Sequence, residues 1–500
     1  MSGPGGPVPT PPLLDLPLAH LLQSGGDHRL IVDPATGVSP YRVAPQIRDS
    51  VPLGSCTASS PSVTAYRAAE KLLSRLQASS NLASESDRVT SSQRERIQKL
   101  FRMPQGSKVI LTPSGTDVIY LVSLIALRRS ERVHHVIVGA SELGGGTVLA
   151  AQGKAISDSA PFGSTAVGTP LAGLAERCTA EPVYLRRDDG AQIDEQVVEE
   201  SVSAAVERVP ASSAVVLHLV AHSKTGLRAP SADLCERLSA RLGDRLLVLV
   251  DGAQGRLAPR DIRRALKLGF PVLVTGSKFY SGPPFSSALL LPETLSSDIG
   301  PLPPSLSDWF SSDGFPTSWE LTRSSLREQA NPGLALRWEA ALAEIERYHN
   351  VPSRHRAGVY HTFAGAVHEV FGPSEVLEID VPMPPVHRLV TALGAFPSVF
   401  CLRIRGNDGF LRKADLSSLH KLLDTDQGSE HPYLAGRFHL GQPVALGPPE
   451  TTTSAVLRVA LGARLVSDLG STPDAGGLWL RQMLWALRHK VEYLVKQELF

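Results

Sequence analysis

The sequence predicts an α/β protein with a large domain, built on a mostly parallel sheet covered by helices, and a smaller C-terminal α+β domain. Short aliphatic runs between residues 108 and 292 are continuous rather than alternating, as in strands that are buried on both faces. Amphipathic helical patterns separate several of these runs, and such alternation is typical of a layered α/β domain. Beyond residue 310 the apolar residues alternate instead, which is typical of strands with one covered face.

Length and composition agree with this class. The chain has 500 residues, of which 42% are hydrophobic and 20% charged, as in globular proteins with a sizeable core. Its 50 Lys and Arg residues against 49 Asp and Glu residues give a net charge of +1, so we expect neither nucleic acid nor a membrane as partner. The 4 cysteines have no CxxC spacing, which argues against structural zinc and a disulfide framework. No apolar run of about 18 residues and no secretory signal is seen, so we expect a cytoplasmic protein.

We expect three segments along the chain. Residues 1–61, which open with a Pro/Gly-rich lead, would form an N-terminal arm. Residues 62–310 would form the large domain, which begins with helical patterns at 63–76 and 91–101. Residues 311–500 would hold an interdomain helix and the small domain.

The large domain is predicted to contain six strands. Helical patterns at 231–242 and 261–268 lie between later strands, and each is followed by a glycine, which commonly ends a helix. The predicted strands are 108–112, 134–140, 213–221, 245–252, 271–276 and 287–292.

The last segment has its own pattern. A long helix is predicted over residues 333–349, where it would connect the two domains. Residues 399–406 and 455–462 alternate at period two, as strands of a half-covered sheet do. The closing amphipathic helix, over 478–497, has a polar face of mixed charge, which favours packing in the core over contact with a membrane.

Polar loops follow four of the predicted strands at the edge where open parallel sheets bind ligands. Ser114, Gly115 and Thr116 follow the first strand and begin a helix. Free N–H groups at such a helix start bind phosphate, with hydroxyl groups adding hydrogen bonds. A plain helix cap would explain the same residues.

The other loops carry ionisable groups. Asp251, with Gln254 close behind it, ends a buried strand and therefore needs a cationic partner, unless it caps the next segment. Lys278 follows an apolar strand; burial there would lower the pKa of its amine and make it a nucleophile, whereas a surface lysine is the alternative. His222 and Ser223 would lie at the same edge.

These loops together predict a cofactor. A phosphate site, a carboxylate, an amide and a lysine amine at one edge match pyridoxal 5′-phosphate. Its aldehyde forms a Schiff base with a lysine, its pyridinium nitrogen pairs with an acid and its phosphate binds a helix N-terminus. We expect this cofactor and no metal.

The same motifs resemble the class V aminotransferase branch of fold-type I pyridoxal-phosphate enzymes, which includes cysteine desulfurases and kynureninase. The resemblance extends over about residues 52–466 and implies a fold like that of aspartate aminotransferase. It rests on seven blocks in the family's order: GSCTASSP (54–61), NLASESDR (81–88), PSGTD (113–117), HSKTG (222–226), DGAQG (251–255), TGSKFYSGP (275–283) and SAVLRVALGARLV (454–466).

The resemblance implies a role for each matched residue. Lys278 would form the Schiff base, Asp251 would keep the pyridine nitrogen protonated, and Gln254 would bind the phenolic oxygen. Arg458 would bind the substrate carboxylate as a bidentate pair, with an arginine paired to an acid on the sheet as the alternative. The implied cofactor-binding residues are Ser114, Gly115, Thr116, Leu143, Ser223, Asp251, Gln254, Ser277 and Lys278, and the implied substrate-binding residues are Arg458, Thr57, Glu142 and His222.

The sequence departs from the family pattern in several places. Where the family has Glu-His, with the histidine stacked on the cofactor, residues 141–144 read Ser-Glu-Leu-Gly. Leu143 could cover the ring but cannot relay a proton. Ser277 stands in place of the usual histidine, and Ser223 in place of asparagine. Residues 436–454 contain no cysteine, so a desulfurase, which needs a mobile thiol there, is disfavoured.

Three functions remain open. An aminotransferase acting on a small amino-acid-like substrate is the simplest, because the lysine alone can shuttle the proton. The altered loops around Glu142 and His222 leave room for a lyase, or for an enzyme of a specialised pathway that forms carbon–carbon or carbon–heteroatom bonds. A non-catalytic relative is disfavoured because Lys278, Asp251 and Gln254 are all retained. The resemblance also implies a homodimer.

Asn331 and Arg337, near the interdomain helix, are candidates for contacts across the interface of that dimer. The alternative for both is a role at the surface of the single chain.

Overall fold

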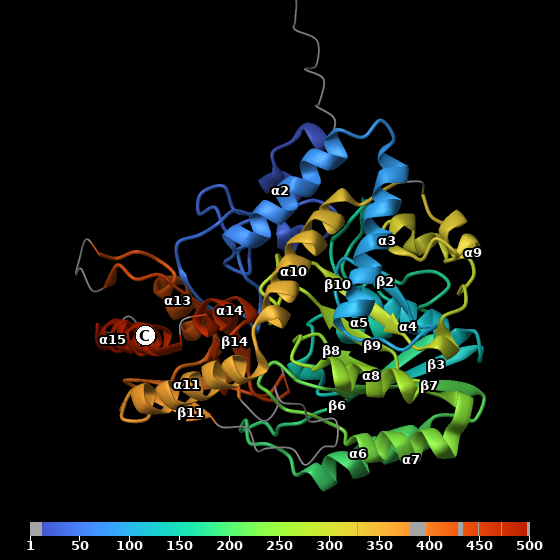
Figure 1. The fold of residues 1–500 in the computed structure, drawn as a ribbon. Coiled ribbons are helices and arrows are strands. Elements are labelled where there is room, and N and C mark those ends of the chain that lie inside the picture. The colour runs from blue at the N-terminus through green and yellow to red at the C-terminus, as the bar shows by residue number, and fades with distance from the viewer. Residues whose placement is uncertain are drawn as a thin grey trace, which may run out of the picture.

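The structure, a computed structural model, is organised around two sheets, one in each half of the chain (Figure 1). None of the helices in the described part of the chain is long and apolar enough to cross a membrane. The structure describes residues 13–327, 329–380, 397–428, 434–448, 450–471 and 473–497.

The larger sheet has seven strands in the order β2-β10-β9-β8-β7-β3-β6. Only β10 runs antiparallel to its neighbours; the other pairs of this sheet are parallel. The prediction of a mostly parallel sheet is therefore confirmed. The strands are β2 (Lys108–Thr112), β3 (Arg132–Val138), β6 (Cys178–Val183), β7 (Ser213–Val220), β8 (Leu246–Gly252), β9 (Val272–Thr275) and β10 (Ser287–Leu291).

Strand β6 was not predicted from the sequence. Glu181 and Pro182 interrupt its apolar pattern, and both are partly exposed. The strand lies at the edge of the sheet beyond β3, where a proline costs no hydrogen bond to a second neighbour.

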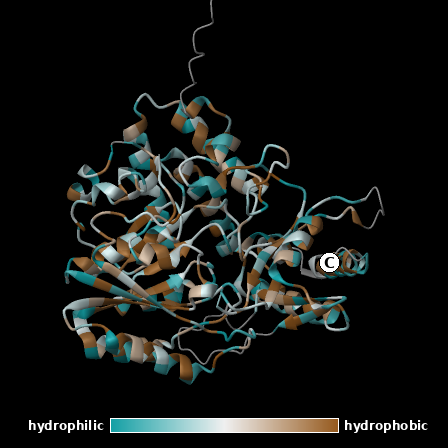
Figure 2. Cartoon of the chain, turned by 180° about the vertical axis from the view of Figure 1, so that it is seen from behind, coloured by the Kyte–Doolittle hydropathy of each residue, from teal (hydrophilic) through white to brown (hydrophobic). Residues whose placement is uncertain are grey.

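Helices cover the sheet on both faces. Figure 1 shows α6 (Glu195–Arg208) and α7 (Ala232–Leu242) along one face, and α4 (Asp117–Leu127) toward the other. All residues of β7, β8, β9 and β10 are buried, as their continuous aliphatic runs require. Figure 2 shows this apolar character in the strands, with polar residues on the outer helices.

Around this layer lie further helices. Two long N-terminal helices, α2 (Val63–Gln77) and α3 (Leu82–Leu100), pack against α10, the predicted interdomain helix, which begins at Pro332 and ends at Asn350. The shorter helices of this part of the chain are α1 (Leu18–Leu21), α5 (Thr147–Ala151), α8 (Pro259–Lys267) and α9 (Glu320–Ser324).

The second sheet has the strand order β1-β14-β15-β12-β11, with β13 paired to β12. Its first strand comes from the N-terminal segment and runs parallel to β14. This sheet and its helices confirm the predicted smaller α+β unit. Its elements are β1 (Val51–Leu53), α11 (Ser353–Phe371), β11 (Leu377–Asp380), β12 (Val399–Gly406), β13 (Gly409–Phe410), α13 (Lys413–Leu423), β14 (Phe438–Ala445), β15 (Ala455–Ala460), α14 (Ala463–Gly470) and α15 (Pro473–Lys496).

The N-terminal arm is held against the body of the chain by buried side chains. Arg337 donates hydrogen bonds to the carbonyl oxygens of Leu22, Ser24 and Gly25. The side-chain amide of Asn331 donates to Gly25 O at 3.0 Å. Both side chains are buried within one chain, so the expectation that they lie at a surface or contact a second subunit is wrong. The homodimer and the cytoplasmic location stay predictions.

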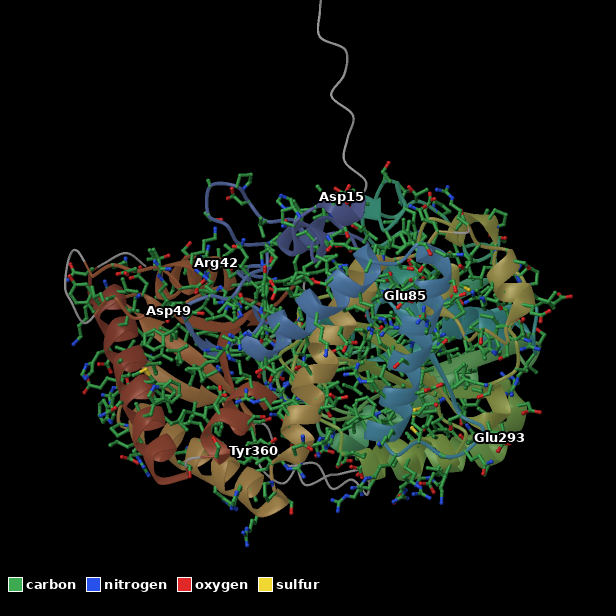
Figure 3. The ribbon with its side chains drawn as sticks, turned by 45° about the horizontal axis from the view of Figure 1, so that its top comes forward. Asp15, Arg42, Asp49, Glu85, Glu293 and Tyr360 are labelled. Carbon is green, nitrogen blue, oxygen red and sulfur yellow. The ribbon has the colours of Figure 1, made fainter. Side chains whose placement is uncertain are left out.

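The arm also reaches the second sheet. Arg42 lies on the side of the C-terminal elements (Figure 3), where its Nε is 3.2 Å from Asp424 Oδ2. Arg48 Nη1 contacts the same oxygen at 2.6 Å. The arm thus bridges the two units and passes over the edge where β8 and β9 end.

Candidate active site

A cavity of about 250 Å³ opens where β8 and β9 end. Its walls come from the N-terminal arm, from loops of the larger sheet and from the second sheet. The residues predicted from the sequence that line it are Thr57, Ser114, Gly115, Thr116, Asp251, Gln254, Ser277, Lys278 and Arg458.

Lys278 and Asp251 meet because their strands are parallel neighbours. Asp251 lies near the end of β8, opposite Leu273 of β9, and Lys278 follows the end of β9. Burial lowers the pKa of the Lys278 amine, while the charge of Asp251 acts in the opposite direction. Burial raises the pKa of the Asp251 carboxyl, and the N–H of Ala253, which donates to Oδ1 at 2.9 Å, opposes this. The site therefore holds an amine that loses its proton more easily than a surface lysine.

The loop from Ser114 to Thr116 leads directly into α4. Ser114 N donates to Asp117 Oδ2 at 2.7 Å, and Asp117 N donates to Ser114 Oγ at 3.3 Å, which fixes the turn. Within the described residues, the N–H groups of Gly115 and Thr116 have no protein acceptor, and both residues line the cavity. A helix start with free N–H groups suits an anion, as the phosphate prediction requires.

Gln254 ties this edge to the arm. Its Nε2 donates to Cys56 O at 3.1 Å, and its Oε1 accepts from Arg256 Nη1 at 3.1 Å. Arg256 is buried and also donates to Ser55 Oγ at 3.0 Å. These bonds hold residues 55–57 of the arm beside the cavity.

Arg458 reaches the cavity from β15 of the second sheet. It is 2% exposed, and all its hydrogen bonds go to neutral oxygens. Its Nη2 donates to Thr57 Oγ1 and to Gln442 O, both at 2.8 Å, and Nη1 donates to Lys224 O at 3.1 Å. None of the ion pairs among the described residues involves Arg458, so these residues give no support to the alternative of a sheet arginine paired with an acid. Its charge remains available to an anionic ligand.

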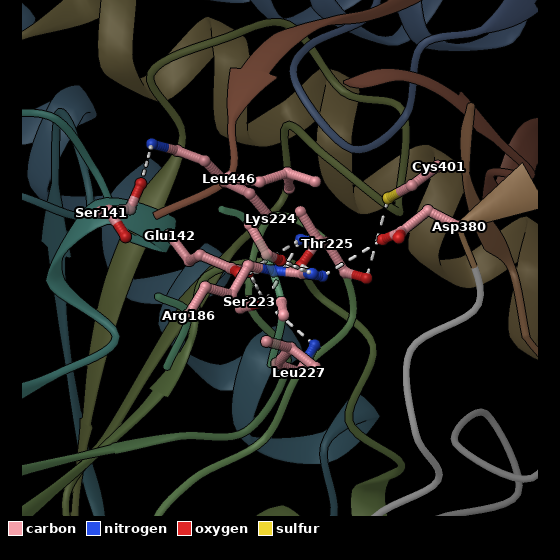
Figure 4. A network of polar contacts seen from close by, with 12 residues as sticks. Ser141, Glu142, Arg186, Ser223, Lys224, Thr225, Leu227, Asp380, Cys401 and Leu446 are labelled. Carbon is pink, nitrogen blue, oxygen red and sulfur yellow. Dashed lines mark hydrogen bonds and ion pairs between the residues drawn. The ribbon is translucent and has the colours of Figure 1, made fainter. Parts of the chain in front are cut away.

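Two predicted residues belong to a buried network beside the cavity instead (Figure 4). Glu142 is 1% exposed, and its Oε1 accepts from Arg186 Nε at 2.9 Å. Its Oε2 accepts from the hydroxyl groups of Ser223 and Thr225. The described residues that line the cavity include neither Glu142 nor Ser223. The expected contacts of these residues with substrate and cofactor are therefore corrected, because their side chains hydrogen-bond to each other and stabilise a loop.

The other two predicted residues also lie off this cavity. His222 Nδ1 contacts the carbonyl oxygen of Ser223 at 2.9 Å, and burial lowers the pKa of its imidazole well below the usual value. Leu143 is buried and lines a second, adjoining cavity rather than the one that holds Lys278; its contact with a cofactor ring stays a prediction.

Several lining residues were missed from the sequence. Arg29 and Tyr41 come from the arm, whose loop-like sequence carries no signal of where it will fold. Gln442 comes from β14, which the sequence did not predict. Lys224 stands within the recognised HSKTG block, but spacing alone does not tell which of its side chains face the cavity. Burial lowers the pKa of its amine to about 7, and the like charges of Arg458 and Lys278 act in the same direction.

The second cavity, of about 900 Å³, opens directly beside the first. The two share Gly145, Lys224, Gln442 and Arg458 as lining residues. A ligand held at Lys278 can therefore extend past Arg458 into the larger space.

Comparison with known proteins agrees with this architecture. No family model matches the sequence, and no curated protein matches it. Among solved structures, a NifS-like protein matches with a TM-score of 0.53 at 12% identity, over 88% of this chain and 99% of that one. The chain therefore has the same fold as this NifS-like protein. The fold-type I resemblance seen in the sequence is thereby confirmed at the level of the fold.

Other solved structures share the fold at similarly low sequence identity. The cysteine desulfurase CsdA of Escherichia coli has a TM-score of 0.50 and 16% identity, over 86% of this chain and 94% of its own. The Oryza sativa protein TDC, solved with PLP and tryptamine, has a TM-score of 0.51 and 12% identity, over 87% of this chain and 82% of its own.

Proposed function

We propose that this protein binds pyridoxal 5′-phosphate through Lys278 and acts on a small amino-acid-like substrate. One observation carries the proposal. A single cavity gathers a lysine amine of lowered pKa, a buried aspartate, a helix start and an arginine; among the described residues, the N–H groups of this helix start have no acceptor and the arginine has no acidic partner. The solved structures that share the fold include one with PLP bound, which supports the same cofactor.

The residues of the cavity fit each part of this cofactor. The N–H groups of Gly115 and Thr116 would hold the phosphate at the start of α4. The carboxylate of Asp251 would keep a proton on the ring nitrogen, and Gln254 lies within the same wall to bind the ring oxygen. When bound, pyridoxal 5′-phosphate supplies an electron sink that stabilises negative charge on the carbon beside the substrate's amino group.

The remaining groups would bind and orient the substrate. The guanidinium of Arg458 would take the α-carboxylate, which would replace some of its present contacts to neutral oxygens. The hydroxyl of Thr57 already bonds Arg458 Nη2 and would position it. The Nζ of Lys278, which loses its proton easily, would move a proton at the substrate carbon.

We propose amino-group transfer as the simplest reaction, because it needs only the proton shuttle that Lys278 provides. A lyase, or an enzyme that forms carbon–carbon or carbon–heteroatom bonds, is the second candidate. Lys224 favours it, because a second amine with a pKa of about 7 in the same cavity could act as a further acid or base. Formation of a keto acid, with the amino group passed to a second keto acid, would distinguish transfer from these reactions.

The cofactor proposal is tested by adding pyridoxal 5′-phosphate to the purified protein. We expect a visible absorption band to rise and saturate at one equivalent per chain, and we expect Lys278→Ala to abolish the covalent link. The control is Lys267→Ala, at an exposed lysine in the last turn of α8, which should behave as wild type. A wild-type protein that shows no band after reconstitution would overturn the proposal.

A further inference from the structure

The second cavity carries an unusual surplus of positive charge. Helix α13 lines it with Lys413, Ser417 and Lys421, which recur at intervals of four residues and so share one face of the helix. Lys224 and Arg458 line it from the opposite side, where it joins the first cavity.

Most of this charge is not compensated by the protein. Arg42, which also lines the cavity, is paired with Asp424. By contrast, none of the ion pairs among the described residues involves Lys224, Lys413 or Lys421.

Little negative charge faces the cavity at the α13 wall, because Asp415 of this helix accepts from the backbone N–H of Arg412 and is not among the described lining residues. His420 lines the cavity too, but its Nε2 donates to Leu440 O at 3.0 Å, and burial lowers its pKa to about 4, so the ring is neutral near pH 7. One carboxylate, Glu450, stands among the described lining residues. Four cations that form no ion pair among the described residues therefore line the cavity with one carboxylate, and an anion between them would reduce their mutual repulsion.

A solvated lysine face would be the ordinary explanation for Lys413 and Lys421, because both are exposed. That explanation does not apply to Lys224, because burial and the charges of Arg458 and Lys278 lower the pKa of its amine more than the carboxylate of Glu142 raises it. Such a group is stabilised by a bound anion and destabilised without one. The cluster is also continuous with the carboxylate-binding arginine of the first cavity.

We propose that this cavity is a second anion subsite, which makes the substrate an amino acid whose side chain ends in an anionic group. The α-carboxylate would lie on Arg458, and the side-chain carboxylate or phosphate would point toward Lys224, Lys413 and Lys421. The inference rests on the proposed function for the placement of the amino group. The two sites for anions, in contrast, are formed by residues of the two adjoining cavities that share Arg458.

Substrate pairs that differ in one charge test this proposal. The change in the absorption of the bound cofactor gives apparent dissociation constants for L-glutamate against L-glutamine and for O-phospho-L-serine against L-serine. We expect each anionic member to bind at least about tenfold more tightly in the wild type, from charge-assisted bonds. The double variant Lys413→Gln/Lys421→Gln should lose most of that ratio and leave the binding of L-glutamine unchanged. Lys71→Gln, at an exposed lysine of α2, is the control.

A second measurement does not depend on the cofactor. Calorimetry with glutarate, which carries two carboxylates and no amine, should detect binding to the wild type that is weakened at least about tenfold in the double variant. Pentanoate, with one carboxylate, should bind both proteins equally.

Equal binding of neutral and anionic substrates, or a ratio that the double variant preserves, would overturn the anion subsite while the cofactor band stays intact. A missing cofactor band with normal discrimination between glutarate and pentanoate would instead overturn the proposed function alone.

Discussion

Two regions beside the larger sheet bury charged side chains, and they do so in opposite ways. In the network of Glu142 and Arg186, each carboxylate oxygen accepts hydrogen bonds and the guanidinium is bonded to oxygens on several sides. In the neighbouring cavity, the amine of Lys278 donates to no residue of the described chain, and Arg458 has no acidic partner there. The charges of the first region are paired with each other, whereas the amine of Lys278 and the guanidinium of Arg458 face a cavity.

Structural and functional charges in a fold of this kind differ in whether the protein itself supplies their partners. A buried ion pair with full hydrogen bonding is strongly destabilised when one partner is removed. A buried charge that faces a cavity without a partner is a cost that the folded protein tolerates for function. Variants in the two regions should therefore change different properties.

The largest expected effect comes from Lys278→Ala. Loss of the amine should reduce turnover of any amino-acid substrate by at least roughly a thousandfold, because both the covalent attachment and the proton transfer depend on it. The free energy of unfolding of the cofactor-free variant should be unchanged or higher, since a desolvated amine is removed. Steady-state kinetics and urea unfolding measure the two. If the variant kept its turnover, Lys278 would have no role in the reaction and the two regions would not differ in function.

Glu142→Gln should have the next largest effect, and on stability. The variant removes one of the two acids that contact the buried Arg186 and leaves Asp380, whose Oδ2 lies 3.4 Å from Nη2, so the free energy of unfolding should fall by about 1–3 kcal/mol. Urea unfolding measures it, with Glu207→Gln in the exposed pair with Arg241 as the control that changes little. If Glu142→Gln proved as stable as wild type yet inactive, Glu142 would belong to the reaction after all.

A smaller effect is expected from Arg458→Lys. A lysine cannot bind a carboxylate in the bidentate manner of arginine, so the Michaelis constant for an α-carboxylate substrate should rise by about an order of magnitude or more. The substrate's amine analogue without a carboxylate should bind both proteins alike. An unchanged Michaelis constant would remove Arg458 from the substrate site.

The smallest effect is a pH dependence at Lys224. Its pKa is about 7 in the folded protein and 10.5 in the reference state, so above pH 7 the unfolded chain binds the proton that the folded chain releases. Stability from this group therefore rises with pH between these values, by about 1 kcal/mol from pH 7 to pH 8. Urea unfolding of the cofactor-free protein and of Lys224→Met at several pH values measures the contribution of this amine to the free energy of unfolding. Parallel pH profiles for the two proteins would show that the amine is not desolvated.

Much of the fold follows from local patterns in the sequence. The runs Lys108–Thr112 and Val399–Gly406 were predicted to the residue, the first from its continuous aliphatic side chains and the second from its alternation at period two. Strand β14 was missed because Gly441 and Pro443 interrupt its pattern, and the strand is irregular between Gly441 and Val444. The edge strand β6 was missed for the related reason given above.

The site residues could be predicted only where the end of a strand determines their position. Asp251 lies near the end of β8 and Lys278 follows the parallel neighbour β9, so their meeting is a consequence of topology. The placing of Arg29 and Tyr41 depends instead on the arm, which Asn331 and Arg337 anchor from about 300 residues away in the sequence. No local pattern encodes such a contact.

The claim that Lys278 holds the cofactor can be checked by trapping the covalent link. The protein loaded with pyridoxal 5′-phosphate is reduced with borohydride, digested and mapped by mass spectrometry. We expect one modified peptide, which contains Lys278, even though the amine of Lys224 lines the same cavity with a pKa of about 7. Modification at Lys224, or at exposed lysines without preference, would contradict the claim.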